Sequence, residues 1–211
     1  MIRLLSLTLI LFILLVSGCA QQPQKVQPPT NKEDWAKHQS QILEIRDWQA
    51  TGKLGVKVPN DGGSASIHWQ QNDSDYQIDL NGPLGLGKMT INGKPDSVTL
   101  IQGDKPPQTA KTAEELIIKN TGWNIPVTQL AYWVRGLPAP KAKVTRYAFN
   151  EQGGLSELEQ AGWKIVYGDY VQTTLPATTA NPSENIALPG RITAEFKDVR
   201  LTLIIREWQL Q

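Results

Sequence analysis

The stretch ASIHWQQNDSDYQIDL, residues 65–80, decides the fold. Apolar and polar residues alternate on both sides of a turn, with the apolar positions at Ala65, Ile67 and Trp69 and then at Tyr76, Ile78 and Leu80. Alternation with a period of two places one side of each segment on a buried face, and the Asn-Asp-Ser turn between them predicts a hairpin.

The same alternation recurs along the chain, in residues 49–58, 88–92, 97–102, 143–150, 156–160, 163–171, 191–196 and 200–209. Turn sequences such as Asn92-Gly93 separate these segments. Ten or eleven short antiparallel strands with few helices predict a mainly β fold, either a barrel or a strongly curved sheet.

Three segments have helical features instead. Thr30 with Glu33, and Thr112 with Glu115, have the capping-box spacing that opens a helix. The first helix is expected to run to about residue 46 and the second to end near Gly122. The third follows Pro126 and has apolar residues at i, i+3, i+4 and i+7, namely Leu130, Trp133, Val134 and Leu137.

Each of these helices has an apolar face that needs cover. A barrel of about eleven strands encloses more space than its own side chains fill. The helices are therefore expected to plug the opening as a lid, and a cavity between apolar strand and helix faces suits an acyl chain. The residues expected to line it are Trp69, Tyr76, Ile78, Leu80, Leu116, Leu130, Trp133, Trp163 and Ile165.

The first eighteen residues have the composition of a signal peptide. Arg3 precedes an apolar or hydroxyl run from Leu4 to Val16, which is too short for a bilayer span of about 20 residues. The run ends in Val16-Ser17-Gly18-Cys19, which resembles the lipobox of bacterial lipoproteins. Cys19, the single cysteine of the chain, is therefore expected to carry the lipid, and Ala20 after it favours the outer membrane.

The rest of the chain is predicted to divide into two parts. Residues 19–30 contain three prolines within a polar stretch, which predicts a flexible tether behind the lipid. Residues 31–211 are long enough for a single domain with a sizeable core. Without Arg3 the 21 Lys and Arg fall to 20, equal to the 20 Asp and Glu, and with no basic stripe nucleic acid is not an expected partner.

The sequence offers little for catalysis. The two histidines, His38 and His68, are expected to be exposed and lie near no nucleophile or metal partner in sequence. No Gly-x-Ser-x-Gly elbow occurs, and Cys19 is committed to the lipid. We therefore expect no enzymatic activity, no metal and no cofactor.

An unusual loop lies between two predicted strands. The segment GPLGLG, residues 82–87, places Leu84 and Leu86 among glycines beside Pro83, where a hairpin loop is normally polar. Leu84 either folds back to plug the end of the barrel or protrudes to touch lipid. Exposing one leucine forfeits about 1.5 to 3 kcal/mol, a cost that calls for a compensating role.

Several stretches together resemble the LolB family, the outer-membrane receptor of the bacterial lipoprotein-localisation pathway. They are the lipobox, Trp69-Gln70-Gln71 with the hairpin of residues 80–91, the helical segments of residues 121–126 and 133–138, and residues 162–170 and 191–208. The resemblance covers nearly the whole mature length, whereas the tether and residues 173–188 match poorly.

The resemblance implies an open eleven-stranded antiparallel barrel with a three-helix lid, the fold also used by the soluble periplasmic carrier. It implies a monomer, anchored on the periplasmic face of the outer membrane, that accepts lipoproteins from a LolA-like carrier through its cavity. It also implies that Leu84 protrudes, with Pro83 and Leu86 in the same loop, and helps to insert the cargo into the inner leaflet. The alternative is a lipid-anchored, lipocalin-like binder of a small apolar ligand, which gives no reason for an apolar loop tip.

Overall fold

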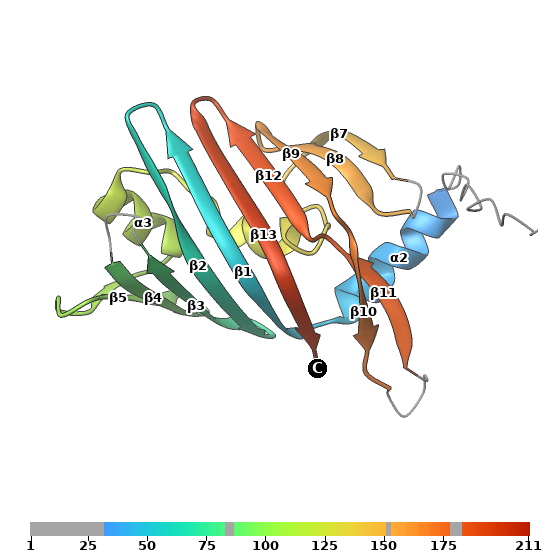
Figure 1. Ribbon diagram of the computed structural model, residues 1–211, viewed down its shortest axis with the longest axis horizontal. Helices are drawn as coiled ribbons and strands as arrows, with labels where there is room; N and C mark the ends of the chain where they lie inside the picture. The colour runs from blue at the N-terminus through green and yellow to red at the C-terminus, as the bar shows by residue number, and fades with distance from the viewer. Residues whose placement is uncertain (1–31, 83–86, 151–152, 178–182) are drawn as a thin grey trace, which may run out of the picture.

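The computed structural model describes residues 32–82, 87–150, 153–177 and 183–211. In these ranges eleven strands form one antiparallel sheet, in the order β6-β5-β4-β3-β2-β1-β13-β12-β9-β8-β7. The sheet curves around helices α3 and α4 (Figure 1), and it stays open because the order ends at β6 and β7 without pairing them. The predicted mainly β fold, an open antiparallel barrel with helices, is confirmed.

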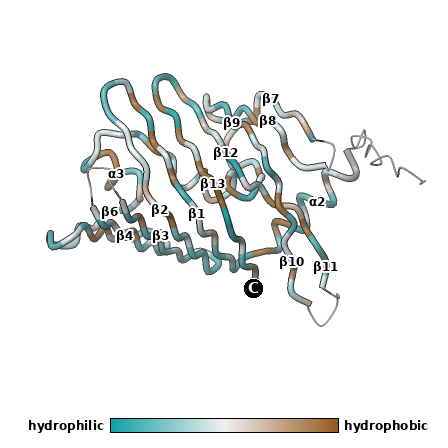
Figure 2. Tube along the Cα trace, viewed as in Figure 1, coloured by the Kyte–Doolittle hydropathy of each residue, from teal (hydrophilic) through white to brown (hydrophobic). Residues whose placement is uncertain are grey.

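The first six strands form a meander. They are β1 (Asp47–Val58), β2 (Asp61–Asn72), β3 (Asp75–Gly82), β4 (Gly87–Lys94), β5 (Ser97–Gln102) and β6 (Gln108–Ala110). The quoted stretch makes the β2–β3 hairpin, in which Trp69 pairs with Ile78 and Ile67 with Leu80. The alternation therefore buries these side chains on one face, as predicted. Figure 2 shows hydrophobic and hydrophilic residues following one another along the strands of the sheet.

The remaining strands of the main sheet are β7 (Val144–Phe149), β8 (Leu155–Gln160), β9 (Trp163–Gly168), β12 (Arg191–Phe196) and β13 (Val199–Leu210). β13 joins them to the meander by pairing with β1. The register between β1 and β13 shifts between Thr51 and Gly52. A side chain at Gly52 would put its Cβ 2.0 Å from the carbonyl oxygen of Ile204, so this close approach requires glycine.

The three helices are α2 (Lys32–Glu44), α3 (Ala113–Thr121) and α4 (Val127–Trp133). The hydroxyl of Thr112 accepts a hydrogen bond from the backbone N–H of Glu115, and Gly122 ends α3 in a left-handed conformation. The carboxylate of Glu114 accepts a 2.7 Å hydrogen bond from the backbone N–H of Thr128, which ties α3 to the first turn of α4. The predicted start and end of α3 are confirmed; the predicted opening of α2 at Thr30 lies outside the described residues.

The expected strand of residues 163–171 is wrong beyond Gly168. Asp169 has a φ of 51°, which breaks the extended chain, and its carboxylate accepts a 2.8 Å hydrogen bond from Arg191. The next strand, β10 (Val171–Leu175), pairs with β11 (Glu184–Leu188) in a separate two-stranded sheet. This hairpin projects beside the C-terminus of the chain, at the end of β13 (Figure 1).

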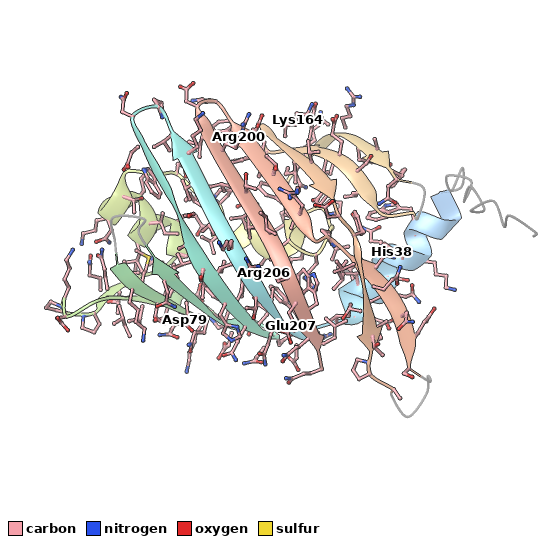
Figure 3. All side chains as sticks on the ribbon, in the orientation of Figure 1. His38, Asp79, Lys164, Arg200, Arg206 and Glu207 are labelled. Carbon is pink, nitrogen blue, oxygen red and sulfur yellow. The ribbon has the colours of Figure 1, made fainter. Side chains whose placement is uncertain are left out.

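The buried side chains form a core between the curved sheet and the helices. Charged side chains such as Arg206 and Glu207 of β13 are exposed, and both lie on a strand in front of the helices in Figure 3. Within the described ranges no helix combines the length and the hydropathy needed to cross a bilayer.

Candidate functional site

The inner face of β1–β4 and β13 encloses an apolar cavity under α3 and α4. Its volume is about 60 Å³. Its walls are almost entirely apolar side chains, namely those of Leu54, Val56, Ile67, Trp69, Ile78, Leu80, Met89, Ile91, Ile117, Thr121, Trp123, Ile125, Val127, Leu130, Leu201 and Leu203. We call β1–β4 and β13 the cavity half of the sheet.

The apolar cavity is closed by the helices and by the chain that joins them. Ile117 and Thr121 come from α3, Trp123 and Ile125 from the connection, and Leu130 from α4. Its 60 Å³ is well below the roughly 300 to 1,000 Å³ of pockets that hold drug-sized ligands. An acyl chain therefore enters only if α3, α4 or both move away from the sheet.

A second cavity, which we call the polar vestibule, adjoins the apolar one. Its volume is about 360 Å³, and its walls mix polar and apolar groups. It is lined by Leu43, Ile45, Arg46, Trp48, Trp69, Gln71, Asp73, Ser74, Tyr76, Val127, Thr128, Ala131, Tyr132 and Arg135. Trp69 and Val127 line both cavities, so these two side chains stand at the junction.

The two cavities follow one another along β3. Tyr76 lines the polar vestibule, and Ile78 and Leu80 line the apolar cavity. Gly82 lies six positions after Tyr76 in this strand, a span of about 20 Å. The vestibule therefore lies at the end of β3 opposite to Gly82. The predicted insertion residues Pro83, Leu84 and Leu86 lie outside the described residues.

Arg135 is the charged group buried in the vestibule, with 9% of its surface exposed. Its Nη1 donates to the carbonyl oxygens of Ile42, at 3.3 Å, and Ile45, at 2.8 Å, at the C-terminal end of α2. Its guanidinium lies 5.7 Å from the ring centre of Trp48 and 5.6 Å from that of Tyr132. Burial lowers the pKa of Arg135 to about 10, so the side chain stays charged at neutral pH.

Tyr76 lines the same cavity and is only partly buried. Burial, with the nearby charge of Glu114 as a second cause, raises the pKa of Tyr76 to about 12. The phenol is therefore neutral at physiological pH and can donate or accept a hydrogen bond.

Strands β7–β9 and β12 form what we call the packed half, because their inner side chains are buried among one another and against α4 and the chain that follows it. Trp163 and Ile165 of β9 are buried there, and the Trp163 ring lies 6.0 Å from that of Trp133 at the end of α4. Gln160, 1% exposed, holds this region together. Its oxygen accepts from the indole N–H of Trp133 and the backbone N–H of Ala139, and its nitrogen donates to the carbonyls of Ala139 and Ala142, all at 2.8 Å.

The residues predicted to line the cavity are thus spread over four places. Trp69, Ile78, Leu80 and Leu130 line the apolar cavity, and Tyr76 lines the vestibule. Leu116 and Trp133 are buried on the helices α3 and α4, while Trp163 and Ile165 lie in the packed half. Contact of any of them with an acyl chain stays a prediction.

The histidines are less exposed than expected. His38 lies with its ring 6.1 Å from that of Trp35, and burial lowers its pKa. The His68 ring shares a 3.0 Å hydrogen bond with the hydroxyl of Thr51. Among the described residues no group of three or more His, Cys, Asp and Glu side chains gathers to hold a metal ion.

Three residues of this region were not predicted from the sequence: Trp48, Arg135 and Gln160. Their roles depend on contacts between segments 87 residues apart, as for Trp48 with Arg135, or 27 apart, as for Gln160 with Trp133. Gln160 could have been found from the sequence, because it is a polar residue at a position where the alternation of β8 predicts an apolar one.

Comparison with known proteins gives one consistent result. The family model described as "Outer membrane lipoprotein LolB" matches residues 46–208. The outer-membrane lipoprotein LolB of Cellvibrio japonicus is 47% identical over 210 residues, which cover 100% of this chain and 98% of the relative. That of Stutzerimonas stutzeri is 34% identical over 93% of this chain and 91% of the relative.

The fold is also found in solved structures of distant sequence. A domain provisionally named an outer membrane lipoprotein-sorting protein, from Vibrio parahaemolyticus, has a TM-score of 0.50 at 8% identity, over 85% of this chain and 91% of that one. A LolA superfamily protein from Nitrosomonas europaea has a TM-score of 0.47 at 8% identity, over 83% and 93%. At such identities the first likeness concerns the fold alone.

Proposed function

This chain belongs to the LolB family of outer-membrane lipoproteins, and from that premise we propose how it handles its cargo. The chain is an outer-membrane lipoprotein that acts as a lipoprotein receptor. The role of such a receptor implies lipoprotein cargo and a LolA-like carrier as partners.

The proposed mechanism is transfer of acyl chains without covalent chemistry. A periplasmic carrier docks, α3 and α4 move off the sheet, and the acyl chains of the cargo enter the apolar cavity. The observation that carries this proposal is the cavity itself, because its walls are apolar on every side and its cover consists of two short helices and their connection. Burying apolar chain against such walls is favourable by about 25 cal/mol per Å².

In this proposal the transfer requires no nucleotide, metal or cofactor. The chain catalyses no reaction, and it acts as a monomer. Direction comes from a higher affinity for the acyl chains in the receptor than in the carrier, and then from the membrane as a deeper sink. The lipocalin-like alternative shares the cavity but has no use for an apolar loop between β3 and β4.

Two parts of the mechanism, anchoring to the membrane and release of the cargo, are assigned to residues outside those that the structure describes. Residues 1–18 act as the signal peptide, Cys19 carries the lipid, and residues 19–30 tether the domain of residues 31–211 to the periplasmic face of the outer membrane. Leu84, beside Pro83 and Leu86, touches the bilayer and helps release the cargo into the inner leaflet. The Val-Ser-Gly-Cys sequence and the apolar residues of the 82–87 segment support these assignments.

A reconstituted transfer assay tests the proposal. Radiolabelled lipoprotein in complex with its carrier is mixed with the lipid-anchored receptor in liposomes, and cargo is followed from carrier to receptor to membrane. Leu84→Glu should accept cargo but fail to deliver it, because placing a charge in the acyl region costs about 2.5 kcal/mol or more. Leu84→Ile, which keeps the apolar area, is the matched control and should deliver normally.

Two results would overturn parts of this proposal. If wild-type receptor takes no cargo from the carrier, the receptor mechanism fails as a whole. If Leu84→Glu unfolds the domain, or delivers at the normal rate, the loop has no role in insertion. The proposal that the apolar cavity takes up the acyl chains would then stand without it.

A further inference from the structure

The polar vestibule has donors that lack acceptors. The indole nitrogen of Trp48 is buried, and it has no hydrogen-bond partner among the residues that the structure describes. In the same part of the chain, Arg135 bonds to carbonyls through Nε and Nη1, and no bond is made by Nη2. A buried donor without a partner costs about 1 to 3 kcal/mol, so the N–H of Trp48 calls for a ligand that brings an acceptor. Arg135 lines the same cavity and keeps part of its surface exposed, so its Nη2 can donate a second bond to that ligand.

The charge of the vestibule also favours acceptors. Arg46 and Asp73, at its exposed rim, lie 3.5 Å apart and offset one another. Arg135 has no carboxylate partner within salt-bridge distance among the described residues and is held by carbonyl oxygens and two aromatic rings instead. Arg135 therefore presents a positive charge to the vestibule, which attracts oxygen acceptors.

The carboxylate of Glu114, close to the vestibule, limits which ligands fit there. Glu114 binds the backbone N–H of Thr128, and Thr128 lines the vestibule, so a carboxylate adjoins the cavity on the side of α4. A fully charged anion would be repelled by it, whereas neutral carbonyl oxygens would not. The fitting ligand is therefore neutral and made of acceptors.

The position of the vestibule supplies the remaining constraint. Its walls meet those of the apolar cavity at Trp69 and Val127. A ligand that spans both places must carry acceptor oxygens where its apolar chains begin. Ester carbonyls of a diacylglyceryl group have this arrangement, since each is bonded directly to the first methylene of an acyl chain.

We infer that the polar vestibule binds the ester carbonyls of the cargo's diacylglyceryl-cysteine, with Trp48 and Arg135 as donors. This inference rests on the proposed function, and it adds a head-group site to the apolar cavity. The receptor then distinguishes an acylated glyceryl group from a plain hydrocarbon chain, and it fixes which end of the lipid stays near the vestibule.

The test compares two synthetic peptides on the soluble domain. One carries an S-dipalmitoylglyceryl-cysteine, and the other carries its dialkyl ether analogue, which has the same chain lengths but no carbonyls. Their affinities are measured by displacement of a fluorescent fatty acid. Wild type should prefer the ester by about threefold to tenfold, the effect of one or two net hydrogen bonds.

Protein variants locate the donors. Trp48→Phe removes the unpartnered N–H and should lower the ester-to-ether ratio by about threefold. Arg135→Lys keeps the charge but loses the planar fork and should lower it as well. Trp35→Phe is the matched control, because the Trp35 ring packs against that of Phe149 at 5.3 Å and lines neither cavity; its ratio should not change. Partial unfolding does not imitate the effect, because both peptides sample the same folded population.

The outcomes separate this inference from the proposed function. If neither peptide displaces the fatty acid from wild type, the receptor cavity itself is refuted and the head-group site with it. If both bind equally to wild type, or if the ratio survives in both Trp48→Phe and Arg135→Lys, the acyl cavity stands and the head-group site is refuted. The same ester and ether pair of phosphatidylethanolamine separates the two sources of this chemistry, and a preference seen for the phospholipid alone would overturn the assignment to cargo.

Discussion

The cavity half and the packed half of the sheet have the same alternating sequence but different interiors. In the cavity half, inner residues such as Ile78 and Leu80 face empty space under α3 and α4. In the packed half, Leu158 and Ile165 are fully buried, and Gln160 binds the chain that follows α4. The alternation decides which residues point inward, whereas the segment that covers them decides whether they face a cavity.

We therefore expect the packed half to contribute mainly to the stability of the fold and the cavity half mainly to binding. The packed half fixes the C-terminal end of α4 through Gln160 and Trp133, so that end resists motion. The N-terminal part of α4, through Val127 and Leu130, and the C-terminal part of α3, through Ile117 and Thr121, lie over the cavity. We expect the cavity half to tolerate substitution at a cost in binding, and the packed half to tolerate little.

The largest expected effect is at Gln160. Gln160→Leu keeps the volume but leaves four buried groups without partners: the indole N–H of Trp133, both backbone groups of Ala139 and the carbonyl of Ala142. Since each orphan costs about 1 to 3 kcal/mol, the free energy of unfolding should fall by about 4 kcal/mol or more. Urea unfolding measures it. Gln172→Leu on exposed β10 is the control and should change stability by less than about 0.5 kcal/mol; a loss at Gln160 as small as that would contradict the account of the packed half.

A smaller effect is expected from one substitution made in both halves. Leu158→Ala, at a fully buried position, should destabilise the fold by about 3 to 4 kcal/mol. Leu80→Ala should cost only about 2 kcal/mol, because Leu80 already faces empty space and loses fewer contacts. Urea unfolding of the two variants compares them directly, and equal losses would show that the two interiors do not differ in solution.

Two tyrosines, Tyr167 in the packed half and Tyr170 bonded to it, give the smallest expected effects, of opposite sign. The hydroxyl of Tyr170 donates a 2.7 Å hydrogen bond to the carbonyl of Leu155, so Tyr170→Phe should cost about 1 kcal/mol. The hydroxyl of Tyr167 is buried without a partner among the described residues, so Tyr167→Phe should be neutral or stabilise by up to about 1 kcal/mol. Melting temperatures of the two variants at neutral pH give the comparison; a marked loss for Tyr167→Phe would mean that its hydroxyl has a partner.

Alkaline pH sharpens the same comparison. Burial raises the pKa of Tyr167 well above its ordinary value of 10.0, so the folded state holds this proton more tightly than the unfolded state. The stability that this provides is present below pH 10 and is lost as the pH rises above it. Tyr167→Phe should therefore lose stability less steeply than wild type above pH 10, as urea midpoints measured at several pH values would show. Parallel curves would count against the burial of Tyr167.

Much of the fold could be predicted from the sequence, because local chemistry determines it. The β2–β3 hairpin follows from the alternation of Ile67, Trp69 and Ile78, and α3 from Thr112 and Gly122. The break at Asp169 could not be predicted, because it lies against a segment distant in sequence: a Cβ at Gly190 would be 2.1 Å from the carbonyl oxygen of Asp169.

The candidate site was less predictable for the same reason. Apolar side chains such as Leu80 and Ile165 have similar sequence surroundings, and only the path of α3 and α4 places one at the cavity and the other in the packed half. The vestibule depends on Arg135 reaching the end of α2, about 90 residues earlier in the chain. No local pattern encodes such a contact.

The most direct test of the central claim locates the acyl chains in the loaded receptor. A lipoprotein whose acyl chains carry a photoreactive diazirine is transferred from the carrier to the receptor, irradiated, and mapped by mass spectrometry of receptor peptides. The account predicts crosslinks on the cavity half, on peptides that contain Leu80, Met89 and Ile91, and on α3. Crosslinks concentrated on the packed half, at Leu158 and Ile165, or on the outer face of the sheet, would contradict it.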